Sequence, residues 1–366
     1  MVFENYKISF CIVCMNRLHQ LKETLLKNIL DNYDYSNLEF LVLNYNSQDG
    51  MDEWIKDCLG NYLSAGKVVY YHTTEPASFS HSHSKNLAFK LATGDIVCNL
   101  NADHYTGKGF AAYVNKKFTE EKRIVLTTVD YFNTKLDYHP AKDVFGKVCV
   151  KKSDFLKVRG FDEQMDHYGF EDWDFVNRLE MDGCKRTFVE DFAYLNYISH
   201  GEDERFNLPT DDIYGLYVNY QTPSTSEILF LYKNYSFEKG TLIDNWTINS
   251  DNYICAYYRQ GSRFEYSVEN RKWIRGEWDI VHDDIHLTDK ISGTRTFKSS
   301  PNTLVEHGSN ATYYQIADPE IMENLMTFHY FYHNRVLMEK NLEEKIIVVN
   351  KTGFGEVTLI DTNQGE

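Results

Sequence analysis

Short apolar runs alternate with amphipathic stretches over the first hundred residues. The run KISFCIVC (7–14) predicts a buried strand, and RLHQLKETLLKNIL (17–30) carries leucines at the spacing of an amphipathic helix. The alternation continues with strands at 38–43, 67–72 and 95–101 and with helices at 51–63 and 82–94. Such an order favours an α/β fold with a largely parallel, doubly wound sheet, whose ligands bind at the carboxyl ends of the strands.

The pattern changes beyond Pro209. From there, short aromatic strands are separated by Gly, Asn and Asp, and the PSTS run at 223–226 is interpreted as part of a linker. We therefore predict two domains, an α/β domain over 1–222 and a β-rich domain over 227–366. A length of 366 residues agrees with this division, because single hydrophobic cores rarely grow beyond about 250–300 residues.

Composition narrows the classes of function. A formal net charge of −16 argues against a nucleic-acid partner, because phosphate backbones are held by clustered Lys and Arg. The seven cysteines are scattered, and we interpret them as reduced thiols. No secretory signal or transmembrane segment is expected from the sequence. These features favour a cytoplasmic bacterial protein, with peripheral binding at the inner face of the membrane as an extension of that expectation.

The segment SHSKNLAFKLATGDIVCNLNADH (82–104) carries the first candidate site. It places Lys85 and Asn86 on a predicted helix and Asp103 directly after a predicted strand. A carboxylate at a strand end can hold a divalent cation that bridges the oxygens of a diphosphate. The alternative interpretation is a turn in which Asn and Asp are ordinary turn formers.

This segment resembles the nucleotide-binding half of GT-A glycosyltransferases of the family-two type, including the galactosyltransferase and chondroitin-polymerase types. In that family a Lys or Arg followed by Asn precedes A-x-G-D, an apolar strand and an acidic D-x-D motif. The matching residues are Lys85, Asn86, Ala92, Gly94 and Asp95. Asn101 stands where the first Asp of D-x-D usually stands.

The resemblance implies roles for the residues of this motif. Asp103 would hold the metal ion, Asn101 would bind the ribose, and Lys85, Asn86 and Ala102 would belong to the donor site. The adjacent His104 is a second candidate metal ligand, because imidazole suits a borderline metal such as manganese.

The second candidate site is GFDEQMDHYGFEDWDFVNRL (160–179), about 70 residues after Asp103. A G-F-D-E loop followed by an E-D-x-D helix start resembles the same families. Inverting sugar transfer needs a base for the proton of the acceptor hydroxyl, and Asp172 is the predicted base. Glu171 would accept hydrogen bonds from hydroxyls, and Trp173 would offer a stacking face. The alternative is that these acids merely favour a helix N-terminus through its dipole.

A third position is His200, which follows a predicted strand. Related transferases place a metal-binding His there, although a lone His is more often structural. Together with Asp103 and His104 it would favour Mn2+ over Mg2+, which prefers oxygen ligands.

Two further strand ends complete the predicted donor site. Asn16 and Arg17 follow the first strand, where the family has a short polar turn. Asn44 and Asn46 end the second strand, where the family usually has acids that bind uracil or ribose.

The resemblance covers roughly residues 7–205. It implies an inverting glycosyltransferase that moves a sugar from a UDP-sugar to a hydroxyl of an oligosaccharide or lipid-linked glycan, in surface polysaccharide synthesis. One alternative is a nucleotidyltransferase, for which the expected basic Gly-rich loop is missing from the sequence. The other alternative is a noncatalytic carbohydrate-binding protein derived from a glycosyltransferase.

The C-terminal half lies outside this resemblance. We interpret its aromatic residues as the core of a β-sandwich, with a carbohydrate groove as the alternative. These residues are Trp246, Tyr253, Tyr257, Tyr258, Trp273 and Trp278. A predicted helix over 322–345 and apolar strands near the end pack onto the same domain or form the interface of a homodimer.

Overall fold

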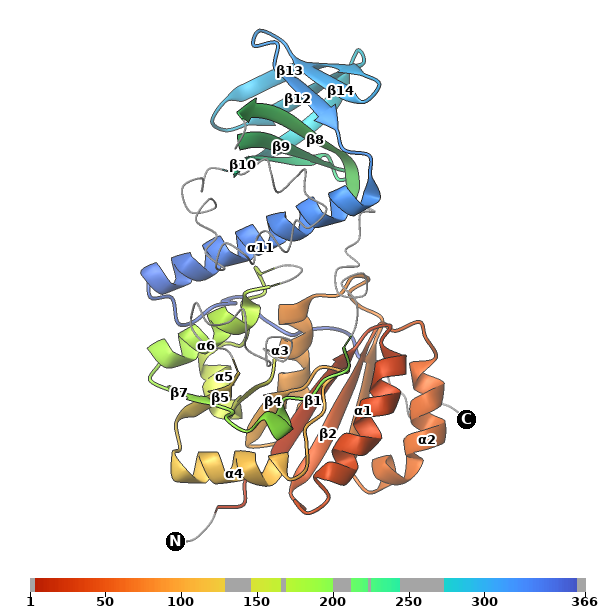
Figure 1. Ribbon diagram of the computed structural model, residues 1–366, viewed down its shortest axis with the longest axis vertical. Helices are drawn as coiled ribbons and strands as arrows, with labels where there is room; N and C mark the ends of the chain where they lie inside the picture. The colour runs from red at the N-terminus through yellow and green to blue at the C-terminus, as the bar shows by residue number, and fades with distance from the viewer. Residues whose placement is uncertain are drawn as a thin grey trace. The chain divides into compact units, whose positions relative to one another are not determined.

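The structure, a computed structural model, describes residues 4–128, 146–165, 169–199, 212–222, 225–243 and 273–360 of the chain (Figure 1). Its contacts divide the chain into two units, Met1–Gly201 with His333–Glu366 and Glu202–Tyr332. The first is an α/β unit and the second is built mainly of antiparallel strands. This division differs from the predicted domains, 1–222 and 227–366, because in the sequence the second unit is inserted between two parts of the first.

Local features explain the difference from the predicted boundary. Strands β8 (Ile213–Thr222) and β9 (Thr225–Tyr232) pair antiparallel, with Thr222 opposite Thr225, so the second half of the PSTS run belongs to a strand of the second unit. Pro and Ser favour turns inside a domain as much as linkers between domains. At the other end of the chain, the N–H of Ile360 donates to the carbonyl of His72 at 2.8 Å, which returns this segment to the first sheet.

The described strands of the first unit form a seven-stranded sheet in the order β3-β2-β1-β4-β6-β5-β7. Strands β1 to β4 pair in parallel, and β6 is antiparallel to both of its neighbours. The strands are β1 Ile8–Cys14, β2 Leu38–Tyr45, β3 Val68–Thr73, β4 Ile96–Asn99, β5 Ile124–Thr127, β6 Val148–Lys151 and β7 Lys185–Phe188. The predicted α/β fold with a mostly parallel sheet is confirmed.

Helices cover both faces of this sheet (Figure 1). One face packs against α1, α2 and α4, and the other packs against α3, α5 and α6. Their bounds are α1 Leu18–Asp31, α2 Met51–Ser64, α3 His81–Leu91, α4 Phe110–Glu120, α5 Lys152–Val158 and α6 Glu171–Met181, and a 3-10 turn, η3, spans Phe192–Tyr194. Because central strands are covered on both sides, β2 is buried along its whole length and shows no polar alternation.

The segment after the last helix is part of the first unit. Phe354 is buried in the apolar cluster of α3 and α5, with its ring centroid 5.8 Å from that of Phe155. Lys90 Nζ donates to the Phe354 carbonyl at 2.6 Å, and Asn350 Nδ2 donates to the Arg159 carbonyl at 2.8 Å. The apolar and polar contacts described for this segment are thus made within the α/β unit, whereas we predicted packing onto the β-rich domain or a homodimer interface.

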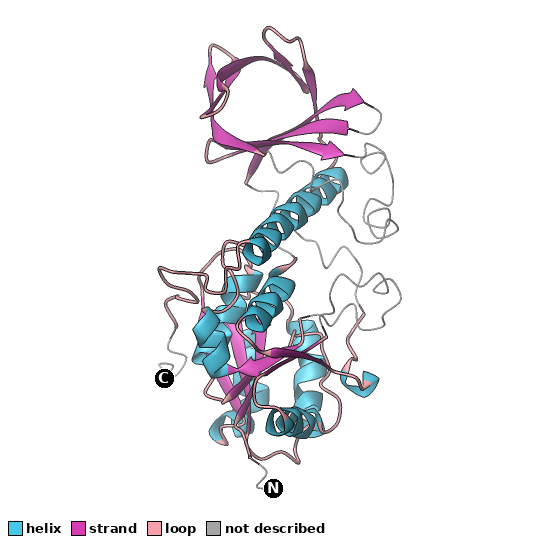
Figure 2. Ribbon diagram, turned by 90° about the vertical axis from the view of Figure 1, so that its left-hand side faces the viewer, coloured by secondary structure: helices cyan, strands magenta, loops and turns pink. Residues whose placement is uncertain are grey.

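The strands of the second unit close into a barrel, which Figure 2 shows as a ring. Its remaining strands are β10 Ser236–Ile243, β11 Ile274–Val281, β12 Asp284–Asp289, β13 Gly293–Ser300, β14 Thr303–Glu306 and β15 Thr312–Gln315. Trp278, Phe297 and Tyr313 lie in the barrel core. Trp278 thus has the core position that we expected, although the architecture is a closed barrel and not a sandwich. Four of the aromatic residues singled out above lie outside the described residues, namely Trp246, Tyr253, Tyr257 and Tyr258.

Helix α11 (Pro319–Glu343) follows the barrel in the sequence. Leu325 and Met326 in its first half pack against barrel residues that include Ile213 and Phe230. Within the described part of the chain, no helix combines the length and the hydropathy that crossing a membrane requires.

Candidate active site

The loops that follow β1 and β2 are bonded to one another at the carboxyl edge of the sheet. The side chain of Asn16, a residue in the left-handed region at φ 56°, accepts a hydrogen bond from the N–H of Gln48 at 2.7 Å. The N–H of Asn16 donates to Ser47 Oγ at 2.9 Å. Asn16 is exposed, and Arg17, which caps α1, is half-buried. Both predicted donor contacts therefore lie where a ligand can reach them.

Asn44 and Asn46, at the end of β2, differ in accessibility. Asn44 is fully buried, accepts from the N–H of Ser47 at 2.8 Å and donates to Asp52 Oδ1 at 3.0 Å. Asn46 is half-buried and donates to the carbonyl of Pro76 at 3.3 Å. Asn44 therefore shapes the loop from inside, whereas Asn46 remains at the surface of the predicted donor site.

The turn after β4 carries Asn101, Ala102 and Asp103. Asn99 Nδ2 donates to Asn101 Oδ1 at 3.1 Å, and the Ala102 carbonyl accepts from Thr24 Oγ1 at 2.6 Å. The first bond orients the Asn101 side chain, and the second holds the main chain of the turn at the carboxyl end of the strand. The side chain of Asp103 keeps 14% of its surface exposed.

Asp103 suits a divalent cation better than His104 does. A carboxylate is a hard oxygen ligand that both Mg2+ and Mn2+ accept. The side chain of His104 is 0% exposed, and its Nε2 lies 3.8 Å from Asp103 Oδ1. Its ring would have to leave the interior to reach a cation that also binds a diphosphate. His200, the third predicted ligand, lies outside the described residues.

A buried lysine near this turn escaped the sequence analysis. Lys147 Nζ donates to the carbonyl of Tyr105 at 2.9 Å and to that of Tyr194. Burial lowers the pKa of Lys147 to about 7, although the Asp103 carboxylate acts in the opposite direction. Lys147 stands in the stretch where the strand and helix pattern weakens, so no motif singled it out.

Lys85, Glu171 and Asp172 form a buried cluster, which we call the Lys85 network. Lys85 Nζ, on α3, donates to Glu171 Oε1 at 2.9 Å and to Asp172 Oδ1 at 2.8 Å. The two acids are the first residues of α6, and all three residues are buried. His81 Nδ1 lies 3.8 Å from Glu171 Oε1. The Lys85 network thus joins the Lys-Asn motif of α3 to the acidic motif at the start of α6, which were separate candidate sites in the sequence.

The charges of the Lys85 network set the protonation states of its members. Burial raises the pKa of Asp172 to about 6, while Lys85 opposes this rise and Glu171 adds to it. Burial acts on Glu171 too, but Lys85 and His81 hold the pKa of Glu171 below its ordinary value. Burial opposes the charge on Lys85, yet the two carboxylates raise its pKa. A carboxylate whose pKa lies near neutrality is suited to accept a proton during a reaction.

Asn86 holds the G-F-D loop. Its Oδ1 accepts from the N–H of Phe161 at 2.7 Å, and its Nδ2 donates to the Phe161 carbonyl at 2.9 Å and to Glu163 Oε1 at 2.9 Å. Gly160 has φ +72°, and a Cβ there would lie 2.1 Å from Asn86 Oδ1, so glycine alone fits. Both side chains of the Lys-Asn dipeptide thus have partners within the protein. Lys85 binds the acids at the start of α6, and Asn86 binds the G-F-D loop.

A second buried cluster, the Arg178 network, consists of Asp162, Asp174, Arg178 and Asn341. Arg178 Nε binds Asp174 Oδ2 at 2.6 Å, and Arg178 Nη2 donates to the carbonyl of Gly160 at 2.7 Å. Asn341 Nδ2 donates to Asp174 Oδ1 at 2.8 Å and to Asp162 Oδ2 at 3.1 Å. This network ties α6 to the G-F-D loop and to the end of α11. Sequence analysis missed it because Asn341 lies far along the chain from the acids that it binds.

Trp173 and Phe170 flank the acid pair. Phe170 adopts φ 66° as the residue before α6, a left-handed conformation that is unusual for a bulky side chain. Trp173 is half-buried, and its ring centroid lies 5.6 Å from that of Phe170. Trp173 therefore keeps part of its surface for the predicted stacking role.

Residues 9–177 match the family model described as Glycosyl transferase family 2. This region is similar to family 2 glycosyltransferases. The match runs from β1 into α6 and includes Lys85, Asp103 and Asp172. The resemblance inferred from the motifs and the enzyme class that it implies are thereby confirmed. No curated protein sequence matches the chain.

Several solved structures are similar to part of the chain. The mannosyltransferase PcManGT from Pyrobaculum calidifontis, in complex with GDP-Man and Mn2+, has 19% identity and a TM-score of 0.42 over 51% of this chain and 55% of its own. S. aureus TarS 1–349 has 17% identity and a TM-score of 0.43 over 55% and 62% of the two chains. Its complex with UDP-GlcNAc has 16% identity and a TM-score of 0.43 over 56% and 62%. The chain therefore covers less than two thirds of each of these structures, and similarity at this level does not assign a donor.

Proposed function

We propose that the first unit is an inverting glycosyltransferase in which Asp172 is the base for the acceptor hydroxyl. The observation that carries the proposal is the Lys85 network. Lys85 binds Asp172 Oδ1 at 2.8 Å, and the pKa of Asp172 near 6 leaves this carboxylate ionised at neutral pH but able to take up a proton. The match of residues 9–177 to glycosyl transferase family 2 supports glycosyl transfer as the reaction.

The proposed reaction forms one bond and breaks one at the anomeric carbon. The acceptor oxygen attacks as the bond to the leaving phosphate oxygen breaks, so the nucleotide departs with both bonding electrons. The hydroxyl proton passes to Asp172, most directly to Oδ2, because Lys85 binds Oδ1. Glu171 stays ionised beside Lys85 and is proposed to accept hydrogen bonds from donor or acceptor hydroxyls.

The proposed donor site is the carboxyl edge around β1, β2 and β4. Asp103 would hold Mn2+, or Mg2+ in its place, which when bound neutralises charge on the leaving diphosphate. The accessible positions of Asn16, Arg17 and Asn46 support contacts with the nucleotide, and Asn101 and Ala102 stand in the turn beside Asp103. The proposed donor is a UDP-sugar, and the proposed acceptor is a glycan of surface polysaccharide synthesis. The homodimer and the cytoplasmic location stay predictions.

The alternative is a noncatalytic carbohydrate-binding protein. Binding a glycan does not require a buried acid whose pKa is held near neutrality, whereas proton transfer does. The Lys85 network therefore favours the enzyme over the binder.

The deciding experiment measures UDP release from UDP-galactose, UDP-glucose and their N-acetyl forms, with and without Mn2+. Wild type is compared with Asp103→Asn and with a control, Asp95→Asn. Asp95 is exposed before the first residue of β4, at the opposite end of the strand from Asp103, and accepts from the N–H of Lys7 at 2.9 Å. We expect metal-dependent release in wild type and in Asp95→Asn, and its loss in Asp103→Asn.

One result would exclude catalysis. If all donors, including GDP- and CMP-sugars, stayed intact while calorimetry showed glycan binding, the binder would replace the transferase. Release that is equal in the presence and absence of metal, and equal in Asp103→Asn, would contradict the assigned role of Asp103 while leaving glycosyl transfer in place.

A further inference from the structure

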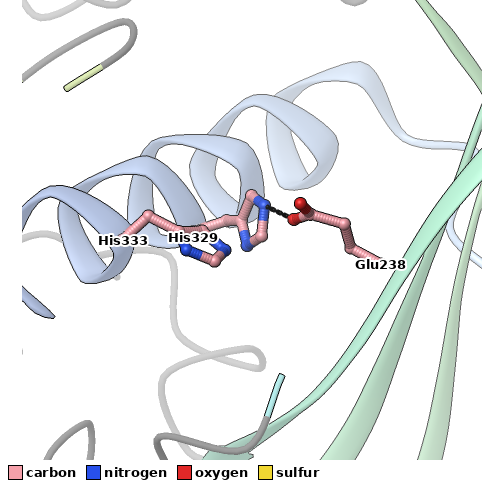
Figure 3. Close-up of side chains that lie close together, drawn as sticks. All are labelled: Glu238, His329 and His333. Atoms are coloured by element: carbon pink, nitrogen blue, oxygen red, sulfur yellow. Dashed lines mark ion pairs between the residues drawn. The ribbon is translucent and has the colours of Figure 1, made fainter. Parts of the chain in front are cut away.

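A second group of chemically reactive side chains consists of Glu238, His329 and His333 (Figure 3). Glu238 comes from β10, and His329 and His333 come from α11. One carboxylate oxygen of Glu238 and one ring nitrogen from each histidine all lie within 4.8 Å of one another. None of these residues belongs to the Lys85 network or to the donor site.

Helix geometry brings the two histidines together. His329 and His333 are four residues apart in the uninterrupted helix α11, so both rings project from the same face, one turn apart. This spacing, H-x-x-x-H, recurs where a helix supplies two imidazole ligands to one metal ion. A third ligand must then come from another element, and Glu238 stands opposite on the strand.

The surroundings of His329 and Glu238 hold their side chains in place. His329 is 3% exposed, and its ring lies 4.5 Å from the ring of Phe230 and 4.5 Å from that of Trp273. Its Nε2 lies 2.6 Å from Glu238 Oε2. Arg275 Nε binds the other carboxylate oxygen, Oε1, at 2.6 Å. Outer partners of this kind orient metal ligands and lower the cost of assembling the site.

We propose that Glu238, His329 and His333 bind a divalent transition-metal ion, for which zinc is the best fit. Two imidazole nitrogens and one carboxylate oxygen are a ligand set that zinc accepts, with a fourth position for water. Imidazole nitrogens disfavour Mg2+ and Ca2+, which prefer oxygen. Bonds of about 2.0–2.2 Å place tetrahedral ligands about 3.3 Å apart, so small side-chain rotations suffice to close the site.

The expected effect of this metal is on stability. Without the ion, Glu238 and His329 pair directly, and on binding the cation replaces the proton that they share. The ion links the strand β10 to the helix that packs on the barrel through Leu325 and Met326. Because binding occurs only when both elements are in place, its free energy stabilises the contact between β10 and α11.

Zinc uptake by the whole purified protein tests the proposal. Protein freed of metal with a chelator is dialysed against Zn2+, and bound zinc and the midpoint of thermal unfolding are measured for wild type, His333→Ala, Glu238→Gln and a control, His307→Ala. His307 is a fair control because its Nε2 lies 3.8 Å from Asp284 Oδ2 and its side chain is 55% exposed. Glu238→Gln keeps a hydrogen-bonding partner for His329, which protects the fold.

The candidate active site can take up zinc as well. The test is therefore the difference in bound zinc between wild type and each variant, not the total zinc content. We expect wild type and His307→Ala to bind one more zinc ion per chain than His333→Ala, whose affinity at this site falls at least about tenfold. Zinc should also raise the unfolding midpoint less in His333→Ala and Glu238→Gln than in wild type. Equal zinc content in wild type and His333→Ala would overturn the proposal, and so would no uptake by wild type.

Discussion

Two carboxylates of α6 show how similar ion pairs serve different ends. Asp172 and Asp174 are two residues apart, both are buried, and each is bound to a cation, Lys85 or Arg178. Asp174 receives bonds on both oxygens, from Arg178 and from Asn341, and its residue is 1% exposed. The described contacts of Asp172 reach Oδ1, and 8% of this residue is exposed.

The difference teaches that a buried ion pair does not by itself indicate catalysis. Arg178 also donates to the main-chain carbonyls of Gly160 and Val158. Its network therefore holds segments of the first unit together. Lys85 is shared by two carboxylates, of which Asp172 keeps an accessible surface and a pKa of about 6. Burial raises the pKa of Asp174 as well. Accessibility and the oxygen that the described contacts leave open therefore separate the candidate base from the structural acid.

The strongest test of this contrast is Asp172→Asn. Removing a general base lowers kcat by about 10²–10⁴-fold. The amide still accepts a hydrogen bond from Lys85, so we expect the unfolding midpoint to stay close to that of wild type. Steady-state kinetics and thermal unfolding measure both quantities. Retained kcat would show that another group accepts the proton.

Arg178→Met should act in the opposite way, on stability. It leaves Asp174 buried without its cation, which costs about 3–5 kcal/mol of unfolding free energy. Urea denaturation measures this cost. Molecules that remain folded should keep Asp172 and its proton affinity. A variant as stable as wild type would mean that Asp174 is not held by the ion pair.

Asn341→Ala tests the structural role of Asp174 with a smaller expected loss of stability than Arg178→Met. It removes the donor to Asp174 Oδ1 and Asp162 Oδ2, and unsatisfied buried acceptors cost about 1–3 kcal/mol. Asn61→Ala on the exposed face of α2 is the matched control, and its denaturation curve should overlay that of wild type. Equal effects of the two substitutions would contradict the role of Asn341.

The subtlest test is a pair of pH profiles. Activity should fall as pH drops through about 6, because Asp172 must be ionised to accept a proton. Lys85 lowers the pKa of Asp172, so Lys85→Met should move this fall in activity to higher pH. Glu171 raises the pKa of Asp172, so Glu171→Gln should move the fall in activity to lower pH. The measurement is kcat/KM between about pH 5 and 8, and shifts of the same sign in both variants would refute the charge balance described here.

Short-range patterns made the fold of the first unit predictable. The apolar runs of β1 and β2 and the spaced leucines of α1 can be read within a dozen residues. Long-range contacts could not be predicted in this way. Asn86 was assigned to the donor site, but its side chain is bound to Phe161, 75 residues away. The family motif singled out Asn86, whereas the residue that its side chain contacts depends on the folded chain.

The insertion of the second unit escaped prediction for a related reason. Composition changes near Pro209, but nothing in the local pattern shows that the chain returns after α11. That return is decided by single contacts of the last segment, such as those of Asn350 with the carbonyls of Arg159 and Phe161. Hydrophobic periodicity does not indicate which distant residues the side chain of Asn350 contacts.

The returning segment also sets an order of events during synthesis. Because a chain emerges from the ribosome with its N-terminus first and its domains fold as units, all strands of the barrel are available before Asn341 and Phe354 are made. The apolar surface of the first unit that Phe354 covers therefore stays exposed until this segment is made, after all strands of the barrel have been synthesised. A nascent chain stalled after α11 would contain every strand of the barrel and the helix that packs on it, but would lack Phe354 in the core of the first unit.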